Sequence, residues 1–424
     1  MSRIKFGTFL APHHPLGESP TLQFQRDLEF ATHLDRLGYD EFWVGEHHST
    51  GWEMIASPEM FLASAAMVTN RIKLGTGVVS LPYHHPFNVA QRMVQLDHIS
   101  HGRAMFGTGP GALPSDARTL NIDPMTQRDR QDEALGVIIR LMRGERFTHE
   151  SDWFTLNDGA LQILPYQEDM PMVTASSLSP SGMTIAGKHG IGVLSIASNS
   201  SDGLQALPTQ WQFAEDSAAQ HGKTVDRKNW RVMLSWHIAE TREQAKQDSI
   251  LGLQKWHNEY NVKVLGRPGA HWVDDPEVLF NEVAGGADAR GGAAVIGTPD
   301  DLIEAILHLK QLTGGFGVVL GFAHDWANIE ASRKSWDLVA RYVMPAVNGT
   351  TRSQMASAEY VAEHKSELMA GASAAVMSKI MSDEKAAAAM GVTMAQMQAR
   401  AAGQQAQPDF RPGGGLSIDA AATE

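Results

Sequence analysis

The sequence has 424 residues, of which 43% are hydrophobic, and it contains no cysteine. Its 35 basic and 48 acidic side chains give a formal net charge of −13, and the lysines and arginines are scattered, which argues against a nucleic-acid partner. The lack of cysteine excludes disulfides, thiolate metal ligands and a cysteine nucleophile. No apolar run reaches the ~20 residues that span a bilayer, and the N-terminus lacks a signal-peptide pattern. We therefore expect a cytoplasmic protein with no membrane partner.

Short apolar, β-rich runs alternate with amphipathic segments up to about residue 345. Strands that alternate with helices favour parallel strands joined by helical crossovers. Eight such units favour an α/β fold of the closed (β/α)8 type, a TIM barrel, over an open doubly wound sheet. The strand candidates are Ile4–Leu10, Glu41–Gly45, Ile72–Leu81, Ala104–Gly109, Met172–Ala175, Gly192–Ile196, Arg231–Ala239 and Gly317–Phe322.

The amphipathic segments include Thr21–Leu37, Pro58–Asn70 and Asp300–Leu312. Gly38 follows the first of them, where a helix often ends in a left-handed cap. Pro299 precedes the third, and proline is favoured at the first helical position. These residues predict where the helices begin and end.

Two regions depart from the alternation. Residues 265–292 are Gly-rich, and a long irregular segment in a compact domain is usually a functional or a disordered loop; we interpret it as a lid-like insertion, with a floppy loop as the alternative. Residues 348–400 are rich in Ala, Met and Gln and predict a helical extension, either for contacts in a homo-oligomer (dimer or tetramer) or as a solvated appendage. Residues 401–424 predict a disordered tail, which leaves residues 1–347 as the barrel domain.

Histidines gather where the predicted strands end, and active sites of such barrels lie at the C-terminal ends of the strands. The pairs are His13-His14, His47-His48 and His84-His85, with His324-Asp325 after the eighth strand. A single histidine is often an ordinary polar side chain, but three pairs at one end favour a shared site.

Neighbouring side chains of a strand point to opposite faces, so both members of a pair cannot face the barrel axis. The chain also lacks His-Glu-x-x-His, a zinc-binding pattern. We therefore predict no metal site, and a metal-dependent hydrolase on the same barrel remains an alternative.

A serine-rich turn follows the predicted strand Met172–Ala175 and precedes an apparent helix from Met183. It contains Ser176, Ser177, Ser179, Ser181 and Gly182. Hydroxyls and free backbone N–H groups at the start of a helix suit a phosphate. The alternative is an ordinary helix cap.

Two glycines lie inside the third predicted strand, at Gly75 and Gly77. Such glycines mark a bulge or the close approach of a flat ligand, and tight packing inside the barrel is the alternative. No Gly-x-Gly-x-x-Gly lies between a strand and a helix, so no Rossmann unit for a nicotinamide is present. A redox enzyme of this sequence would receive its electrons on a carrier reduced elsewhere.

Several motifs together resemble the bacterial luciferase-like flavin monooxygenases, over residues 4–347. They are Tyr39–His48, Ile72–Val79 with Leu81-Pro82 and His85-Pro86, Leu96–Arg103 and Val295–Asp301. Within the family, Phe9–Pro12, Ser80–Pro86 and Gly107–Leu113 are most similar to the limonene 1,2-monooxygenase-like branch.

The resemblance implies a flavin-dependent monooxygenase that inserts one oxygen atom of O2 into a small apolar organic substrate. Epoxidation of a limonene-like terpene is favoured, and insertion next to a carbonyl is the alternative. The implied cofactor is reduced FMN, with FAD as the alternative, supplied by a separate flavin reductase. A deazaflavin-dependent oxidoreductase and a non-catalytic flavin carrier on the same barrel stay open.

The resemblance also assigns roles to residues. His47 would be the acid–base group beside the flavin, with His48 as its neighbour. Thr76 and Gly77 would border the flavin ring, where family members often hold a cis peptide bond.

The phosphate of the flavin would bind to Ser176, Ser177, Ser179, Ser181 and Gly182. Luciferase itself carries an arginine where this chain has about Pro110, so another countercharge is needed, and Arg128 or Arg130 is the candidate.

Trp43, Trp236 and Phe322 would form apolar walls for the substrate, and core packing is the alternative for Trp43. Trp272, in the insertion, is a further candidate.

Overall fold

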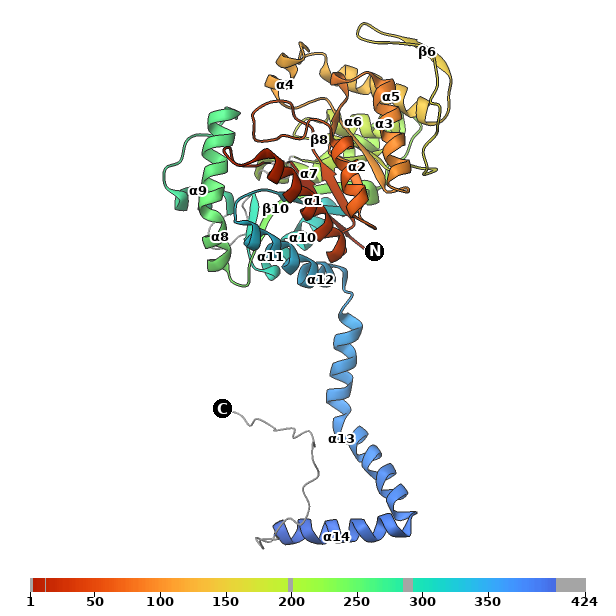
Figure 1. The fold of residues 1–424 in the computed structure, drawn as a ribbon, viewed down its shortest axis with the longest axis vertical. Helices are drawn as coiled ribbons and strands as arrows, with labels where there is room; N and C mark the ends of the chain where they lie inside the picture. The colour runs from red at the N-terminus through yellow and green to blue at the C-terminus, as the bar shows by residue number, and fades with distance from the viewer. Residues whose placement is uncertain (1–2, 12, 197–200, 285–292, 402–424) are drawn as a thin grey trace. The chain divides into compact units, whose positions relative to one another are not determined.

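The computed structural model describes residues 3–11, 13–196, 201–284 and 293–401. Its centre is a closed barrel of eight parallel strands (Figure 1). Neighbouring strands pair in parallel around the ring, and the last strand pairs with the first, Lys5 opposite Val318. In ring order they are β1 (Lys5–Leu10), β2 (Glu41–Val44), β3 (Lys73–Thr76), β5 (Ala104–Gly109), β8 (Met172–Ser176), β9 (Gly192–Ser195), β10 (Trp230–Ile238) and β12 (Val318–Ala323). The prediction of a (β/α)8 barrel is confirmed.

Helices surround the barrel and connect its strands. They are α1 (Pro20–Leu37), α2 (Pro58–Val68), α3 (Pro86–Ile99), α4 (Pro114–Thr119), α5 (Gln127–Met142), α6 (Ser181–His189), α7 (Ser201–Gln220), α8 (Arg242–Lys255), α9 (Pro276–Ala284), α10 (Pro299–Thr313), α11 (Ile329–Leu338) and α12 (Met344–Asn348). Short 3-10 helices lie at η1 (Leu81–Tyr83) and η3 (Arg227–Asn229), and π-helical turns at η4 (Trp256–Val264) and η6 (Val339–Val343).

The helix ends follow the local sequence signals. Gly38 caps α1 with a φ of 87°, in the left-handed region that glycine adopts without strain. Thr298 caps α10 in a reciprocal box with Asp301, and Pro299 occupies the first turn. Both predicted helix boundaries are confirmed.

Several elements were not predicted. A short strand, β11 (Ala294–Gly297), pairs with β10 over Ser235–Ile238, whereas β12 pairs with β10 over Arg231–Ser235. The predicted third strand, Ile72–Leu81, is divided into β3 and the short strand β4 (Val79–Ser80), which pairs with β5. An antiparallel hairpin of β6 (Phe147–Glu150) and β7 (Thr155–Gly159) lies between α5 and β8; its outward residues are polar, so it lacks the apolar alternation that marks a strand.

The strands bury side chains on both faces, as parallel strands do. One hydrophobic cluster fills the space between strands and helices, and a smaller one, which includes Phe9, Trp43 and Phe322, lies inside the barrel. A Cβ on Gly75 would come within 2.4 Å of the Trp43 ring, so this glycine serves tight packing inside the barrel.

The barrel interior also holds a buried ion pair. The guanidinium of Arg231 donates to both carboxylate oxygens of Glu41 at 2.9 Å, and the indole N–H of Trp43 donates to Glu41 at 2.8 Å. Both charged side chains are almost completely buried. Such a pair links β2 to β10, two strands that are not neighbours in the ring, because neither charge can be left alone in a low dielectric.

The region 265–292 is more regular than expected. Its α9 buries Leu279 and Phe280 in a small cluster beside α8 and β11. The glycine pairs that suggested a lid, at 285–286 and 291–292, lie outside the described residues. The irregular part that the structure describes is therefore confined to residues 265–275.

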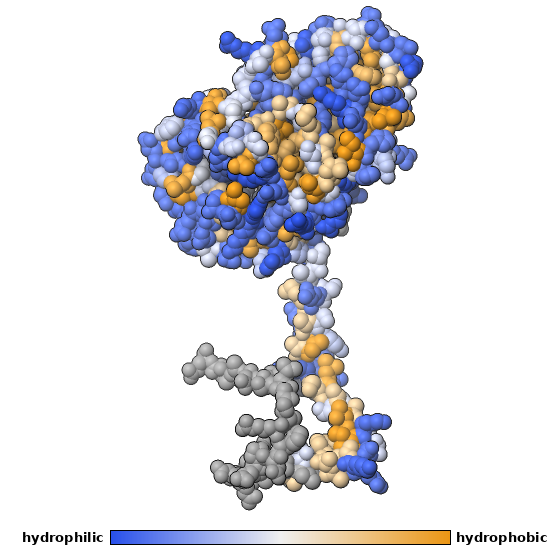
Figure 2. Space-filling model, viewed as in Figure 1, coloured by the Kyte–Doolittle hydropathy of each residue, from blue (hydrophilic) through white to orange (hydrophobic). Residues whose placement is uncertain are grey.

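The chain divides into two compact units, residues 1–350 and 351–424. In the second unit, α13 (Arg352–Met381) and α14 (Glu384–Ala401) are helical, and residues 402–424, most of the expected tail, lie outside the described part. Figure 2 shows hydrophobic side chains exposed on these helices, among them Met355, Leu368 and Met369. None of the helices in the described residues is long and apolar enough to cross a membrane.

The buried ion pair generates a prediction. Replacing Arg231 by Met leaves Glu41 buried without its countercharge, and we expect the free energy of unfolding to fall by about 3–5 kcal/mol, measured by urea denaturation. Arg146→Met is the control, because Arg146 and Asp158 form an exposed pair, and its effect should stay within about 0.5 kcal/mol. Equal effects of the two substitutions would contradict the interpretation.

Candidate active site

A cavity opens at the C-terminal ends of the barrel strands, where β1, β2, β5 and β8 run into their loops. Its empty volume is about 1060 Å³, part of which is open to solvent. The wall includes Phe9, His47, Gly77, Arg128, Ser179 and Gly182. It therefore joins the histidine side of the barrel mouth to the serine-rich start of α6.

His47 lies in this wall with both ring nitrogens engaged by carboxylates. Nδ1 lies 3.1 Å from Asp116 and Nε2 lies 2.8 Å from Glu53. Burial disfavours a charged ring, but the charges of Glu53 and Asp116 outweigh it and raise the pKa of His47 to about 10. The ring is therefore a cation at neutral pH.

The next histidines form a second cluster around Glu46. Nε2 of His48 and Nε2 of His84 lie 2.8 Å and 2.6 Å from the same oxygen of Glu46, and the other oxygen accepts from the backbone N–H of Ser80 at 2.6 Å. Within the described residues, Glu46, His48 and His84 are the one group whose ligand atoms converge as a metal would need. It takes one histidine from each of two pairs, which the alternation of side chains along a single strand does not rule out.

The serine-rich turn faces the cavity with four of its five expected residues. Ser177, Ser179, Ser181 and Gly182 line the cavity, and α6 begins at Ser181, two residues earlier than predicted. Ser176 does not line it. Its neighbour Ala175 does, and adjacent residues of a strand point to opposite faces, so the Ser176 side chain is buried behind the strand.

One arginine completes this end of the cavity. Arg128, from the start of α5, is exposed and lines the cavity, and its guanidinium has no hydrogen bond or ion pair to any residue of the described ranges. Arg130 is engaged elsewhere, 3.5 Å from Asp152 and over the ring of Trp153. Of the two arginine candidates, the structure brings only Arg128 to the cavity.

Thr76 and Gly77 occupy different environments. Gly77 lines the cavity, and its peptide bond to Val78 is cis. The hydroxyl of Thr76 donates to the carbonyl of Gly107 and accepts from its N–H, both at 2.9 Å. The Thr76 side chain therefore links β3 to β5, and Thr76 is not among the residues that line this cavity.

The three aromatic residues also differ. Trp43 is fully buried inside the barrel beneath the cavity, bonded to Glu41. Phe322 lies beside the cavity, stacked on Phe9 with ring centroids 6.1 Å apart. Trp236 packs on Trp336 of α11, with centroids 5.1 Å apart.

Strand alternation explains why Trp236 is outside. Arg231 points into the barrel, so residues an odd number of positions along β10 point outward. Trp43 and Trp236 are therefore not part of the cavity wall, and Trp272, the further candidate, is about half exposed in the insertion.

Glu53 and Asp116, the two carboxylates beside His47, were not predicted from the sequence. Glu53 could have been proposed as a partner of His47, because it is an acidic residue only six positions further along the same loop. Asp116 had no such signal, since it lies on α4, which follows a different strand.

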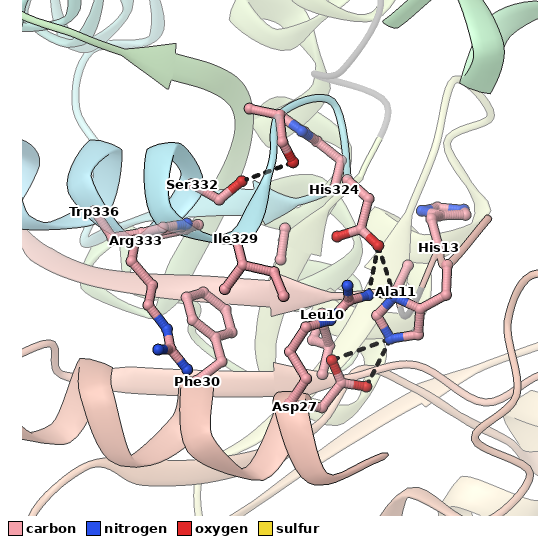
Figure 3. Close-up of a pocket in the computed structure, with 15 residues that line it drawn as sticks. Leu10, Ala11, His13, Asp27, Phe30, His324, Ile329, Ser332, Arg333 and Trp336 are labelled. Carbon is pink, nitrogen blue, oxygen red and sulfur yellow. Dashed lines mark hydrogen bonds and ion pairs between the residues drawn. The ribbon is translucent and has the colours of Figure 1, made fainter. Parts of the chain in front are cut away.

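A second cavity of about 580 Å³, partly open to solvent, lies between β1, β12, α1 and α11 (Figure 3). Beside it, the ring of His14 is held by Asp27 on Nε2 and by Asp325 on Nδ1, each at 2.9 Å; the dashed lines from Asp27 in Figure 3 mark the first contact. Arg26 donates to Asp325 at 2.6 Å. The positive charges of His14 and Arg26 are paired with the negative charges of Asp27 and Asp325. This group therefore offers no unpaired charge to a ligand in the cavity.

The sequence was compared with known proteins. The model of the family "Luciferase-like monooxygenase" matches residues 4–315. The chain is 47% identical to 4-hydroxyprotoasukamycin monooxygenase of Streptomyces nodosus subsp. asukaensis, over 86% of this chain and 97% of that protein. It is also 47% identical to limonene 1,2-monooxygenase of Rhodococcus erythropolis, over 82% of this chain and 87% of that protein.

Among solved structures, the fold is similar to the oxygenating constituent of 3,6-diketocamphane monooxygenase of Pseudomonas putida, a type II Baeyer-Villiger monooxygenase in complex with FMN. The TM-score is 0.67 at 24% identity, and the match covers 81% of this chain and 99% of that one. At this identity the match supports the barrel fold alone.

The buried contacts of His14 generate a prediction about stability. Burial disfavours the charged ring, yet Asp27 and Asp325 outweigh it and raise the pKa of His14 to about 9. A folded-state pKa above the ordinary value of about 6.5 stabilises the fold fully below pH 6.5, and the contribution is lost as the pH rises through about 9.

We therefore expect Asp27→Asn to lower the free energy of unfolding by up to about 3 kcal/mol at pH 6, with little difference from wild type above pH 10. The measurement is urea denaturation over this pH range. A difference that grows with rising pH would contradict it.

Proposed function

The chain belongs to the luciferase-like monooxygenase family, and from that premise we propose that it is a flavin-dependent monooxygenase. It would insert one atom of O2 into a small apolar substrate, and bound reduced FMN would supply the electrons that convert the other atom to water. The observation that supports this most is a single cavity with phosphate-binding groups at one end and a charged histidine at the other.

The groups at the α6 end fit a phosphate monoester. Ser177, Ser179 and Ser181 offer hydroxyl donors, and the first backbone N–H groups of α6 are free of helical partners. Arg128 supplies a positive charge that no acidic side chain in the described ranges neutralises. Hydroxyls, helix N–H groups and one guanidinium are the usual partners of a phosphate.

The other end suits a flat ring. Gly77 presents backbone without a side chain, and Phe9 lies next to it; a Cβ on Gly77 would come within 3.0 Å of the Phe9 ring. His47 faces this part of the cavity with a proton on each ring nitrogen. A fixed positive charge there stabilises negative charge that develops during oxygen chemistry, so the first contribution of His47 is electrostatic.

We propose a small apolar alkene of the limonene type as the substrate, with epoxidation as the reaction. The proposal rests on the 47% identity to limonene 1,2-monooxygenase and on the apolar residues Phe9, Ala11 and Ile196 in the cavity wall. The equal identity to 4-hydroxyprotoasukamycin monooxygenase makes 4-hydroxyprotoasukamycin the second substrate to test.

We also propose that a separate reductase supplies the reduced flavin. The chain has no Gly-x-Gly-x-x-Gly unit for a nicotinamide between a strand and a helix. FMN is favoured over FAD because the serines and Arg128 account for one phosphate group.

Oxygen labelling tests the proposed reaction. The purified protein is mixed with chemically reduced FMN, limonene and ¹⁸O₂, and the products are analysed by mass spectrometry. We expect an epoxide that carries one labelled atom, with the second label in water. Flavin that reoxidises at the rate of free flavin, without a labelled product from limonene or from 4-hydroxyprotoasukamycin in a parallel reaction, would contradict the proposal.

A phosphate-specific variant tests the assigned binding mode. Replacing Arg128 by Met should weaken binding of reduced FMN about tenfold, which corresponds to ~1.4 kcal/mol, in anaerobic titrations followed by fluorescence. Riboflavin, which lacks the phosphate, should bind to both proteins equally. Arg36→Met, at an exposed arginine of α1, is the control. Equal weakening of FMN and riboflavin would place the phosphate elsewhere.

A further inference from the structure

Glu53 is a buried carboxylate on which three side chains from different parts of the barrel mouth converge. Its Oε2 forms an ion pair with His47 Nε2 at 2.8 Å, its Oε1 accepts from the hydroxyl of Tyr260 at 2.8 Å, and Nε2 of His13 contacts the same Oε1. These partners come from the loops after β1 and β2 and from η4. Glu53 is 5% exposed, so it exchanges these contacts with water only at a high cost.

The contacts of His47 dictate its protonation. A neutral imidazole has one N–H and one bare nitrogen, and an ionised carboxylate can only accept hydrogen bonds. His47 has a carboxylate on each nitrogen, Asp116 on Nδ1 and Glu53 on Nε2. Both nitrogens must therefore carry a proton for the arrangement to be satisfied.

Both carboxylates are buried and each is held by a further group. Asp116 also accepts from the backbone N–H of His48 at 3.1 Å and contacts the half-buried hydroxyl of Ser49. Glu53 is fixed at its other oxygen by the Tyr260 hydroxyl. His47 therefore lies between two anions whose positions are set by groups other than His47.

We propose that Glu53 is a positioning residue that keeps His47 doubly protonated and oriented at the cavity wall, and that Tyr260 holds Glu53 in place. The role in oxygen chemistry rests on the function proposed above, whereas the protonation of His47 does not. Neither Glu53 nor Tyr260 lines the cavity, so both act through His47.

Other charged or titratable groups lie near this pair. Those facing His47 or Glu53 from neighbouring elements are His13, His48, Asp116, Tyr260 and, next to Tyr260, Arg267. Burial works against the charge of Glu53, but His47 and His13 outweigh it and hold its pKa well below the usual value. Burial and the charge of Glu53 raise the pKa of Tyr260, which stays neutral and donates.

The direct test is an NMR titration of the whole chain without flavin, with ¹³C-labelled histidine, in which the His47 signal is assigned by its loss in His47→Gln. Wild-type His47 should keep its proton until about pH 10. In Glu53→Gln the nearby negative charge is gone, and the proton affinity of His47 should fall roughly 10- to 1000-fold. The same His47 midpoint in both proteins would overturn the proposal.

A matched variant controls for the general effect of losing a glutamate. Glu133 contacts His149 at 2.9 Å on the β6–β7 side, and Glu133→Gln should leave the His47 titration unchanged. If Glu53→Gln does not fold, the wild-type titration still decides, because a His47 midpoint near 6.5 would overturn the proposal without any variant.

Tyr260→Phe separates the position of the Glu53 side chain from its negative charge, because only the position depends on the Tyr260 hydroxyl. Glu53 stays ionised in this variant, so the His47 midpoint should remain within about threefold in proton affinity, while the ring N–H signals of His47 exchange faster with water. A fall in proton affinity as large as that of Glu53→Gln, or unchanged exchange, would overturn the role of Tyr260.

Activity provides a second, independent readout. The ratio of product formed to flavin oxidised should fall on the alkaline side of its pH profile. In Glu53→Gln this fall should begin at a lower pH than in wild type, in parallel with the lower NMR midpoint of His47. A shifted NMR midpoint in a protein that oxygenates nothing would leave the positioning role intact and contradict only the proposed function.

Discussion

An imidazole with a carboxylate on each nitrogen has to be a cation, and the barrel mouth is arranged around that constraint. The two carboxylates come from different connections, one in the loop of His47 itself and one on α4 after β5. The parallel strands of the barrel all end at one rim, which brings these connections together. The charge is tolerated in a buried place because acidic groups and Tyr260 complete its surroundings. The serine-rich start of α6 and Arg128 line the same cavity as this charged ring.

The fold was largely predictable because parallel strands and their crossover helices leave strong local signals. Runs such as Ala104–Gly109 are apolar throughout, and Pro and Gly mark helix ends at Pro299 and Gly38. Elements without such signals were missed. β11 is four residues long and precedes a proline, and the β6–β7 hairpin is half exposed and polar. Whether a short or polar segment forms a strand depends on the strands that it packs against, and the local sequence does not show which strands those are.

The candidate site was predictable only in part, since side-chain direction depends on register. Ser177, Ser179, Ser181 and Gly182 follow the strand and could be placed by the turn itself. Ser176 and Trp236 lie within strands, where a shift of one residue exchanges inside for outside. Counting from Arg231 would have placed Trp236 outward, but the inward direction of Arg231 became known only from its contact with Glu41.

For the proposed flavin-dependent function, the exposed position of Arg128 has a consequence for cofactor exchange. A charge at the rim is screened by salt over about 10 Å, so its attraction to a phosphate would be modest and the phosphate would arrive and depart readily. A cofactor reduced by another protein would have to travel, and a tight buried phosphate site would retain it between turnovers. Under that proposal the flavin would behave as a diffusing co-substrate, and ionic strength would be one determinant of how quickly it moves between two enzymes.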